Sequence, residues 1–173
     1  MEVALSHARL RPWRLDDSDA LARHANNRNV SRNLRDIFPF PYTEADAQAF
    51  LARVVPMSPA TNLAIEVDGE AAGGIGLRVQ SDVYRRTAEI GYWLSEAHWG
   101  RGIMTEAVVA MTAHAFEQFD LLRIEADVFA RNPASMRVLE KAGFEREAWL
   151  RQRVTKGGET MDAAMYALLR PAS

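Results

Sequence analysis

Residues 89–106 read Glu89-Ile-Gly-Tyr-Trp-Leu-Ser-Glu-Ala-His-Trp-Gly-Arg-Gly-Ile-Met-Thr-Glu106, and this stretch decides the fold. Its first six residues are β-prone and largely apolar, and a loop then leads through Gly100-Arg101-Gly102 into a helix expected to begin near Met104. Backbone amides at a helix N-terminus, left uncovered by glycine, form a concave anion site, and the helix dipole adds partial positive charge. The stretch therefore predicts a strand, a turn and a helix with a phosphate group bound at the turn.

Length and composition are those of one globular domain. The chain has 173 residues, of which 48% are hydrophobic and 25% charged. We expect residues 1–173 to form a single domain, because the chain is too short for two separate cores of ordinary size. No window approaches the length of a membrane-spanning apolar run, and Met1–His7 lacks the basic and apolar segments of a secretory signal. We therefore expect a cytoplasmic protein.

Several kinds of site are excluded by residues that are missing. Cysteine is absent, so disulfides, thiolate zinc sites and an acyl-cysteine intermediate are excluded. A formal net charge of −2 argues against a nucleic-acid partner, which usually meets a concentrated basic face. The four histidines lack metal-ligand spacing, and the common nucleotide-binding, metalloprotease and serine-hydrolase motifs do not occur. We expect no metal.

Before residue 89 the patterns predict mixed elements. Prolines in Phe38-Pro-Phe-Pro-Tyr42 exclude a regular helix there, and the three aromatic rings either seal the core or line a pocket. The expected elements are a strand at 8–13, a helix at 16–27 with Asp16 as N-cap, a loop or short helix at 28–36, a helix capped at Thr43–Asp46, and an antiparallel meander of strands at 62–67, 73–79 and 87–94 with a turn at Asp68-Gly69.

After residue 106 helices and strands alternate. The expected elements are the helix from Met104, a strand at 122–130, a helix begun by Asn132-Pro133 and ended at Ala142-Gly143, and two strands within 144–169 around Lys156-Gly157-Gly158. Strands joined through helices after an antiparallel start indicate a mixed α/β sandwich.

Motifs in this region, taken together, resemble one known family. They are Ile-Gly-Tyr-Trp-Leu at 90–94, Trp-Gly-Arg-Gly-Ile-Met-Thr-Glu-Ala at 99–107, Asn-Pro-x-Ser at 132–135 and Glu-Lys-x-Gly-Phe at 140–144. Over about Leu10–Leu169 the chain resembles the GNAT superfamily of acyl-CoA N-acyltransferases, in particular its ribosomal-protein N-acetyltransferase-like (RimJ/RimL-like) branch. The resemblance implies a GNAT-like α/β (α+β) fold, with a mixed, mostly antiparallel sheet of about seven strands flanked by helices on both faces. It also implies acetyl-CoA as donor and a primary amine as acceptor.

The resemblance further implies which residues bind the donor. In the family a Gln/Arg-x-x-Gly-x-Gly/Ala loop binds the CoA pyrophosphate through backbone amides. The matching residues here, Trp99–Met104, have tryptophan first and methionine last. Because backbone amides make most of the contacts in the family, these two substitutions are tolerable. Arg101 would add a charge-assisted contact, or is merely an exposed loop cation. The implied donor-binding residues are Tyr92, Trp93 and Leu94 along the pantetheine arm, Trp99, Gly100, Arg101, Gly102, Ile103, Met104 and Thr105 at the phosphates, and Asn132, which also caps its helix.

Transfer needs a neutral amine, because an ammonium has no lone pair with which to attack the thioester. Glu89 is the candidate general base, acting directly or through water; the alternative is a surface carboxylate paired with Arg85 or Arg86. By the resemblance Ser135 lies near the sulfur, although serine is also common in a first helical turn. Many members carry a tyrosine acid where this chain has Leu139, so the proton returned to CoA would come from Ser135 or water.

Two classes of function remain open. The first is an acetyl-CoA-dependent N-acetyltransferase in which a protein N-terminus or a small amine attacks directly in a ternary complex, and the absence of cysteine favours it. The second is a non-catalytic acyl-CoA-binding sensor or interaction module, conceivable because the tyrosine is replaced. A plain nucleotide-phosphate binder would bind ATP and CoA equally, and the pantetheine-compatible strand argues against it. We expect acetyl-CoA and an amine as partners, no nucleic acid or membrane, and consider a homodimer open.

Overall fold

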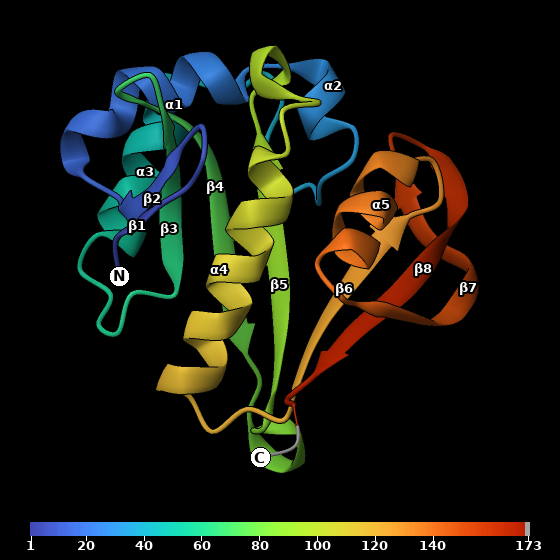
Figure 1. The fold of residues 1–173 in the computed structure, drawn as a ribbon. Coiled ribbons are helices and arrows are strands. Elements are labelled where there is room, and N and C mark those ends of the chain that lie inside the picture. Colours follow the sequence, from blue (N-terminus) through green and yellow to red (C-terminus); the bar gives the residue numbers. More distant parts are fainter. Residues whose placement is uncertain (172–173) are drawn as a thin grey trace. The chain divides into compact units, whose positions relative to one another are not determined.

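The computed structural model describes residues 1–171 and contains five α-helices and eight strands within that range (Figure 1). Residues 172 and 173, the end of the expected domain, lie outside the described residues. The elements are β1 Val3–Ala4, β2 Arg9–Pro12, η1 Leu15–Asp17, α1 Ser18–Ala25, α2 Arg28–Ser31, α3 Glu44–Val54, β3 Asn62–Val67, β4 Glu70–Val79, η2 Asp82–Tyr84, β5 Thr87–Leu94, η3 Glu96–His98, α4 Ile103–Gln118, β6 Arg123–Phe129, α5 Pro133–Lys141, β7 Glu145–Lys156 and β8 Glu159–Leu169.

The strands follow the order β1-β2-β3-β4-β5-β6-β8-β7, and every pairing whose register is resolved is antiparallel except that of β5 with β6. The expected mixed, mostly antiparallel sheet is therefore confirmed. The chain divides into two compact units. The first comprises Met1–Gly76 and Tyr92–Ala107, and the second comprises Leu77–Gly91 and the residues from Val108 onward. Strands β4 and β5 and helix α4 contribute residues to both.

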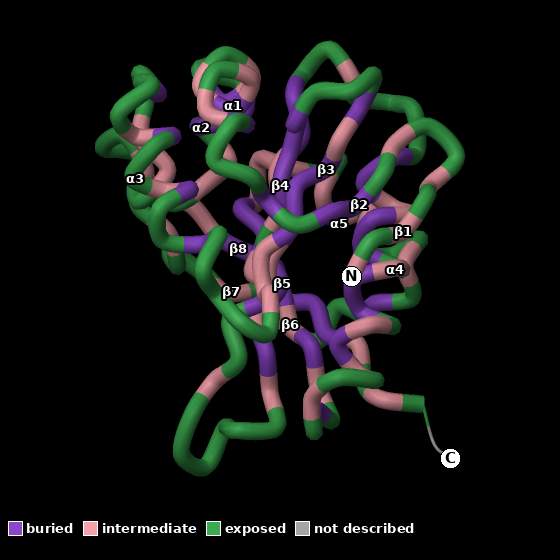
Figure 2. The backbone as a smooth tube through the Cα atoms, turned by 90° about the vertical axis from the view of Figure 1, so that its left-hand side faces the viewer, coloured by how far each residue is buried: buried purple, intermediate pink, exposed green. Residues whose placement is uncertain are grey.

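The first unit is built on the β3–β4 hairpin. Asp68 and Gly69 both have positive φ, 51° and 85°, which is the backbone of the two-residue turn whose twist matches that of the strands. The middle residues of both strands, Leu63–Ile65 of β3 and Ala71–Ile75 of β4, are buried, and Figure 2 shows buried stretches in both strands. Against them pack side chains of α1, α3 and the segments after β2 and before α3, including Leu21, Leu51, Trp13 and Tyr42. The ring of Trp13 meets that of Phe50 edge-on at 5.3 Å.

In the second unit the start of β5 pairs in parallel with the start of β6, Thr87–Glu89 against Arg123–Glu125. Strand β6 then pairs with β8, and β8 with β7, both antiparallel. A register shift within β7 leaves Gln152 with φ of 51°. The carboxylate of Asp162 accepts hydrogen bonds there from the Gln152 amide at 2.8 Å and from the Trp149 indole at 2.7 Å. These bonds hold the irregular part of β7 in place.

Three details differ from the expectations. The eighth strand is the two-residue β1, too short to leave an alternating pattern in the sequence. The helix after residue 15 does not use Asp16 as its N-cap; Asp17 accepts from the Arg14 amide at 2.8 Å, and a 3-10 turn precedes α1. Strand β4 begins at Glu70 rather than at Gly73, whereas helix α4 begins at Ile103, in agreement with the expected start near Met104. The segment at 28–36 contains a short helix, α2, whose N-cap is Asn27.

Candidate active site

The loop between β5 and α4 has the backbone of an anion-binding nest. Gly100 and Gly102 both have φ of 76°, whereas Arg101 between them does not have positive φ. Alternating left- and right-handed residues turn successive N–H groups toward one concave side. A Cβ atom added at either glycine would meet no atom within 4 Å. Glycine is therefore required here for its backbone conformation, while the space over the loop stays open.

Helix α4 adds its first amides to this loop. The Glu106 amide donates to the Gly102 carbonyl at 3.2 Å, which is the first helical hydrogen bond, so helix geometry gives the amides of residues 103–105 no acceptor within the helix. The side chains of Ile103 and Met104 are buried, with exposed fractions of 2% and 9%. The side chain of methionine at the last motif position therefore packs into the core, while its backbone amide remains at the anion-binding loop.

Tryptophan at the first motif position closes the loop. The Trp99 indole N–H donates to the Leu94 carbonyl at 2.8 Å and ties the end of the loop back to the end of β5. Its ring is nevertheless 47% exposed. The indole thus fixes the loop conformation while a large aromatic surface stays available beside the nest.

The turn before the loop, η3, is held by side chains of the α1–α2 region. His24 Nδ1 lies 3.0 Å from the Ser95 hydroxyl. The Glu96 carboxylate accepts from the side-chain amides of Asn27 at 2.7 Å and Asn29 at 3.0 Å. Sequence analysis missed these supports, because their partners lie 67 to 71 residues apart in the chain and no short motif joins them.

The predicted pantetheine strand is backed by an aromatic cluster. Trp93 lies edge-on to Phe38 at 5.4 Å, and Phe38 contacts Tyr42 at 4.9 Å. On β4 a Cβ atom at Gly74 would lie 2.9 Å from the Trp93 indole nitrogen, and one at Gly73 would lie 2.6 Å from the Trp93 carbonyl oxygen. The paired glycines therefore let β5 approach β4 closely. Tyr42 belongs to the buried core and Phe38 packs against it, as expected if these rings seal the core, whereas Phe40 is exposed.

Glu89, the predicted base, belongs to the second unit. Its carboxylate forms an ion pair with Arg78 of β4. The alternative pairing with Arg85 or Arg86 stays a prediction; Arg86 pairs with Asp120 at 2.6 Å, and Arg85 donates to the Asp82 carbonyl of its own turn.

Asn132 and Ser135 also belong to the second unit, at the N-terminus of α5. The Asn132 side chain accepts from the Ser135 amide at 3.3 Å, so the predicted capping role is confirmed. Leu139, at the family's tyrosine position, is fully buried and has no proton to give. The Tyr166 hydroxyl donates to Glu140 at 2.8 Å, and burial raises the pKa of Tyr166. The transfer roles of Glu89 and Ser135 remain predictions.

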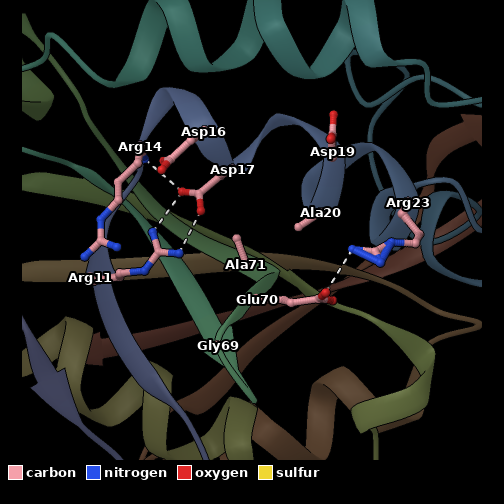
Figure 3. Close-up of a pocket in the computed structure, with 10 residues that line it drawn as sticks. All are labelled: Arg11, Arg14, Asp16, Asp17, Asp19, Ala20, Arg23, Gly69, Glu70 and Ala71. Carbon is pink, nitrogen blue, oxygen red and sulfur yellow. Dashed lines mark hydrogen bonds and ion pairs between the residues drawn. The ribbon is translucent and has the colours of Figure 1, made fainter.

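A separate polar hollow of about 310 Å³ lies beside η1 and α1 in the first unit (Figure 3). The Arg11 guanidinium is buried there, with two hydrogen bonds to Asp17 at 2.7 and 2.8 Å. Arg23 pairs with Glu70 at 3.1 Å. The charged lining residues are Arg11, Arg14 and Arg23 against Asp16, Asp17, Asp19 and Glu70. A ligand with several negative charges finds no excess of positive charge there, so the nest is the better candidate for phosphate.

Two searches of the described residues gave negative results. Within residues 1–171, no group of three or more His, Cys, Asp or Glu side chains is arranged so that it could hold a metal ion. None of the helices in the same range combines the length and apolar character needed to cross a membrane.

Comparison with known proteins assigns the family. Residues 7–145, most of the chain, match the acetyltransferase (GNAT) domain. The chain belongs to the GNAT acetyltransferase family. The family expected from the four motifs is thereby confirmed, and the nest at the start of α4 lies within the matched residues of this GNAT domain.

Relatives extend the family assignment. The GNAT domain is 51% identical over 86 residues to "Probable N-acetyltransferase YjcK" of Bacillus subtilis (strain 168), covering 50% of this chain and 48% of the relative. It is 37% identical over 82 residues to the ribosomal-protein-serine acetyltransferase of Escherichia coli (strain K12), covering 47% of this chain and 46% of that protein. The matches thus span about half the length of these curated relatives.

A solved structure supports both the fold and the predicted branch. Mycobacterium smegmatis RimJ in complex with CoA-disulfide superposes on this GNAT domain with a TM-score of 0.80 at 26% identity, covering 94% of this chain and 81% of RimJ. The resemblance to the ribosomal-protein acetyltransferase branch is confirmed by this neighbour and by the Escherichia coli relative.

Proposed function

We propose that this GNAT domain transfers an acetyl group from acetyl-CoA to a primary amine, by direct attack of the amine on the thioester in a ternary complex. The observation that carries the proposal is the nest formed by Gly100, Arg101 and Gly102 at the N-terminus of α4. Open amides and a helix dipole favour a diphosphate. The absence of cysteine in the chain leaves no thiol to carry the acetyl group, so attack is direct.

Donor binding is assigned residue by residue. The amides of the loop and of Ile103, Met104 and Thr105 bind the pyrophosphate, and Arg101 adds a charge-assisted bond. The exposed Trp99 ring lies beside the nest, next to the donor. The backbone of Tyr92, Trp93 and Leu94 binds the pantetheine arm in the manner of an added strand, and Asn132 binds the end of the arm that carries the thiol.

Transfer removes two protons from an ammonium acceptor and returns one to CoA. Glu89, directly or through water, takes a proton from the ammonium, and the lone pair of the neutral amine then attacks the thioester carbonyl. The nitrogen loses its second proton to water, the C–S bond breaks as the tetrahedral intermediate collapses, and the CoA thiolate receives a proton from water or from Ser135, which regains one from water. No covalent acyl intermediate on the protein is required.

Loss of CoA binding on blocking the nest tests the donor site. Gly102→Trp places an indole over the loop amides, so calorimetric titration with CoA should give no measurable binding. The matched control is Gly157→Trp in the β7–β8 turn, where φ is also positive and a Cβ atom also meets nothing within 4 Å. It carries the same backbone strain and should bind CoA like the parent. Unaltered CoA affinity in Gly102→Trp would overturn the assignment.

Turnover separates an enzyme from a sensor. Acetyl-CoA mixed with a panel of amines, including peptide N-termini, free amino acids and polyamines, should release free thiol, measured with a thiol reagent. Tight CoA binding with no thiol release on any amine would instead support the acyl-CoA sensor.

Peptide N-termini head the panel because relatives include a ribosomal-protein-serine acetyltransferase. The carboxylate that some members carry on the strand entering the last hairpin is missing from Arg151–Val154, which weakens that acceptor and keeps small amines in the test. A cytoplasmic location, a single domain over residues 1–173 and a homodimer stay predictions; size-exclusion chromatography with light scattering measures the last.

A further inference from the structure

His98 immediately precedes the loop and occupies a fixed position. It is the last residue of η3, and its amide donates to the Ser95 carbonyl at 3.0 Å. The turn that carries it is fastened through Ser95 and Glu96 to the α1–α2 region. The imidazole is therefore presented from a supported turn rather than from a free loop.

The ring contacts Arg101, the only cation within the nest tripeptide. His98 Nδ1 lies 3.2 Å from Arg101 Nη1. A guanidinium has donors only, so Nδ1 must accept, which requires a neutral imidazole with its proton on Nε2. Arginine keeps four further N–H donors, enough for two hydrogen bonds to a phosphate group.

The charged and titratable groups around the imidazole favour its neutral form. Burial, the neighbouring His24 and Arg101 lower the pKa of His98, while Asp68 and Glu70 act in the opposite direction. The rings of His24 and His98 are 6.1 Å apart. His24 is itself held by Glu70, with Nε2 3.0 Å from the carboxylate. The balance leaves His98 able to accept from Arg101 near neutral pH.

We propose that His98 is a positioning residue that holds the Arg101 guanidinium at the nest, so that it meets the donor's pyrophosphate without a conformational search. The proposal rests on the proposed function, because it assumes that the nest binds CoA. An exposed arginine otherwise samples many rotamers, and restricting them before binding lowers the entropy lost on binding. His98 acts only through Arg101 and touches neither donor nor acceptor.

A double-mutant cycle on CoA affinity tests this. Arg101→Ala should weaken CoA binding about tenfold, and His98→Ala about threefold. His98→Ala in the Arg101→Ala background should add nothing, because the group it positions is gone. His98→Asn keeps an acceptor oxygen in reach and should recover most of the affinity. In acetyl-CoA turnover, KM should rise while kcat stays unchanged.

Controls separate positioning from folding and from charge. The ligand-free melting temperature of each His98 variant should stay within about 2 °C of the parent. Arg9→Ala, which removes one positive charge from the exposed end of β2, should leave CoA affinity unchanged. An equal loss of affinity from His98→Ala with and without Arg101, or no loss in either background, would overturn the proposal.

The two proposals fail in different ways. If the parent binds CoA but releases no thiol with any amine, the transferase function fails, and the affinity cycle still decides the role of His98. If thiol release is normal and neither substitution changes CoA affinity or KM, the role of His98 fails while the transferase function stands.

Discussion

Glu89 forms an ion pair with Arg78, and the residues next to Glu89 in the sequence do not predict it. Two arginines stand a few residues before it, yet its ion pair is with Arg78, 11 residues away on the adjacent strand. A carboxylate offers about four lone-pair positions, so an ion pair with Arg78 is compatible with the role of base that we propose for Glu89.

The role of Glu89 as base predicts a selective effect on the chemical step. Glu89→Gln preserves shape and removes the basic oxygen, so kcat should fall about 100-fold while KM for acetyl-CoA stays unchanged. The measurement is thiol release under saturating acetyl-CoA. Glu147→Gln is the control, since Glu147 is also a carboxylate paired with an arginine of the same unit, Arg123. Equal kcat values for the parent and Glu89→Gln would assign proton removal to water alone.

Side-chain contacts explain two departures from the family motif. Tryptophan at position 99 replaces a polar residue with an indole that donates to the Leu94 carbonyl, and methionine at 104 is buried. The sequence predicted that backbone groups make both changes tolerable. It did not predict the indole contact, because the short turn η3 that brings residue 99 back to the end of β5 was not predicted.

At the scale of elements, local signals were read correctly where they are strong. Strand β5 has the predicted bounds, and α5 begins at the predicted Asn-Pro cap. The hairpin turns at Asp68-Gly69 and Gly157-Gly158 were also foreseen, since their positive φ values favour such residues. Side-chain pairings were not foreseen. The Arg11–Asp17 pair beside η1 is local but follows no periodic pattern, and the side chains that fasten η3 come from segments 67 to 71 residues away. The two-residue β1 is too short to leave a pattern.

The capping box of α3 predicts a pH dependence of stability. Hydrogen bonds from the Thr43 hydroxyl and amide lower the pKa of Asp46 below its ordinary range. A carboxyl group whose pKa is lower in the folded state stabilises the fold above its unfolded pKa, and this contribution is lost as pH falls through the folded pKa. The stability difference between the parent and Asp46→Asn should therefore be present at pH 7 and shrink below about pH 4.

Urea unfolding at pH 7 and pH 3 measures this difference. Gln48→Ala, further along the exposed surface of α3, is the control and should show no such pH dependence. A difference of equal size at both pH values would mean that Asp46 acts through its shape rather than its charge. Thr43→Ala should lower the free energy of unfolding by about 1 kcal/mol, because it removes the hydroxyl that caps the Asp46 amide.

For the whole molecule, sequence reasoning identified the family and predicted a donor loop, but it did not predict the acceptor. A loop that binds a ligand through its backbone is marked by glycines and a helix start, which can be found in a single sequence. We expect acceptor recognition to depend on side chains from several segments, with the exposed Ile37 and Phe40 before α3 as candidates, and no spacing rule links such residues. Family members can therefore share the loop and differ in their amines.

Because the nest is proposed to bind its ligand through backbone amides, the pH dependence of the reaction can identify the class of acceptor. Backbone N–H groups and arginine do not titrate between pH 7 and 10, so acetyl-CoA affinity should stay flat over that range. The rise of kcat/KM for the amine with pH then reports the acceptor's own proton. A midpoint near 8 marks an α-amine and one near 10 a lysine-like amine. A pH titration of the rate would thus assign the chemical class of the natural acceptor.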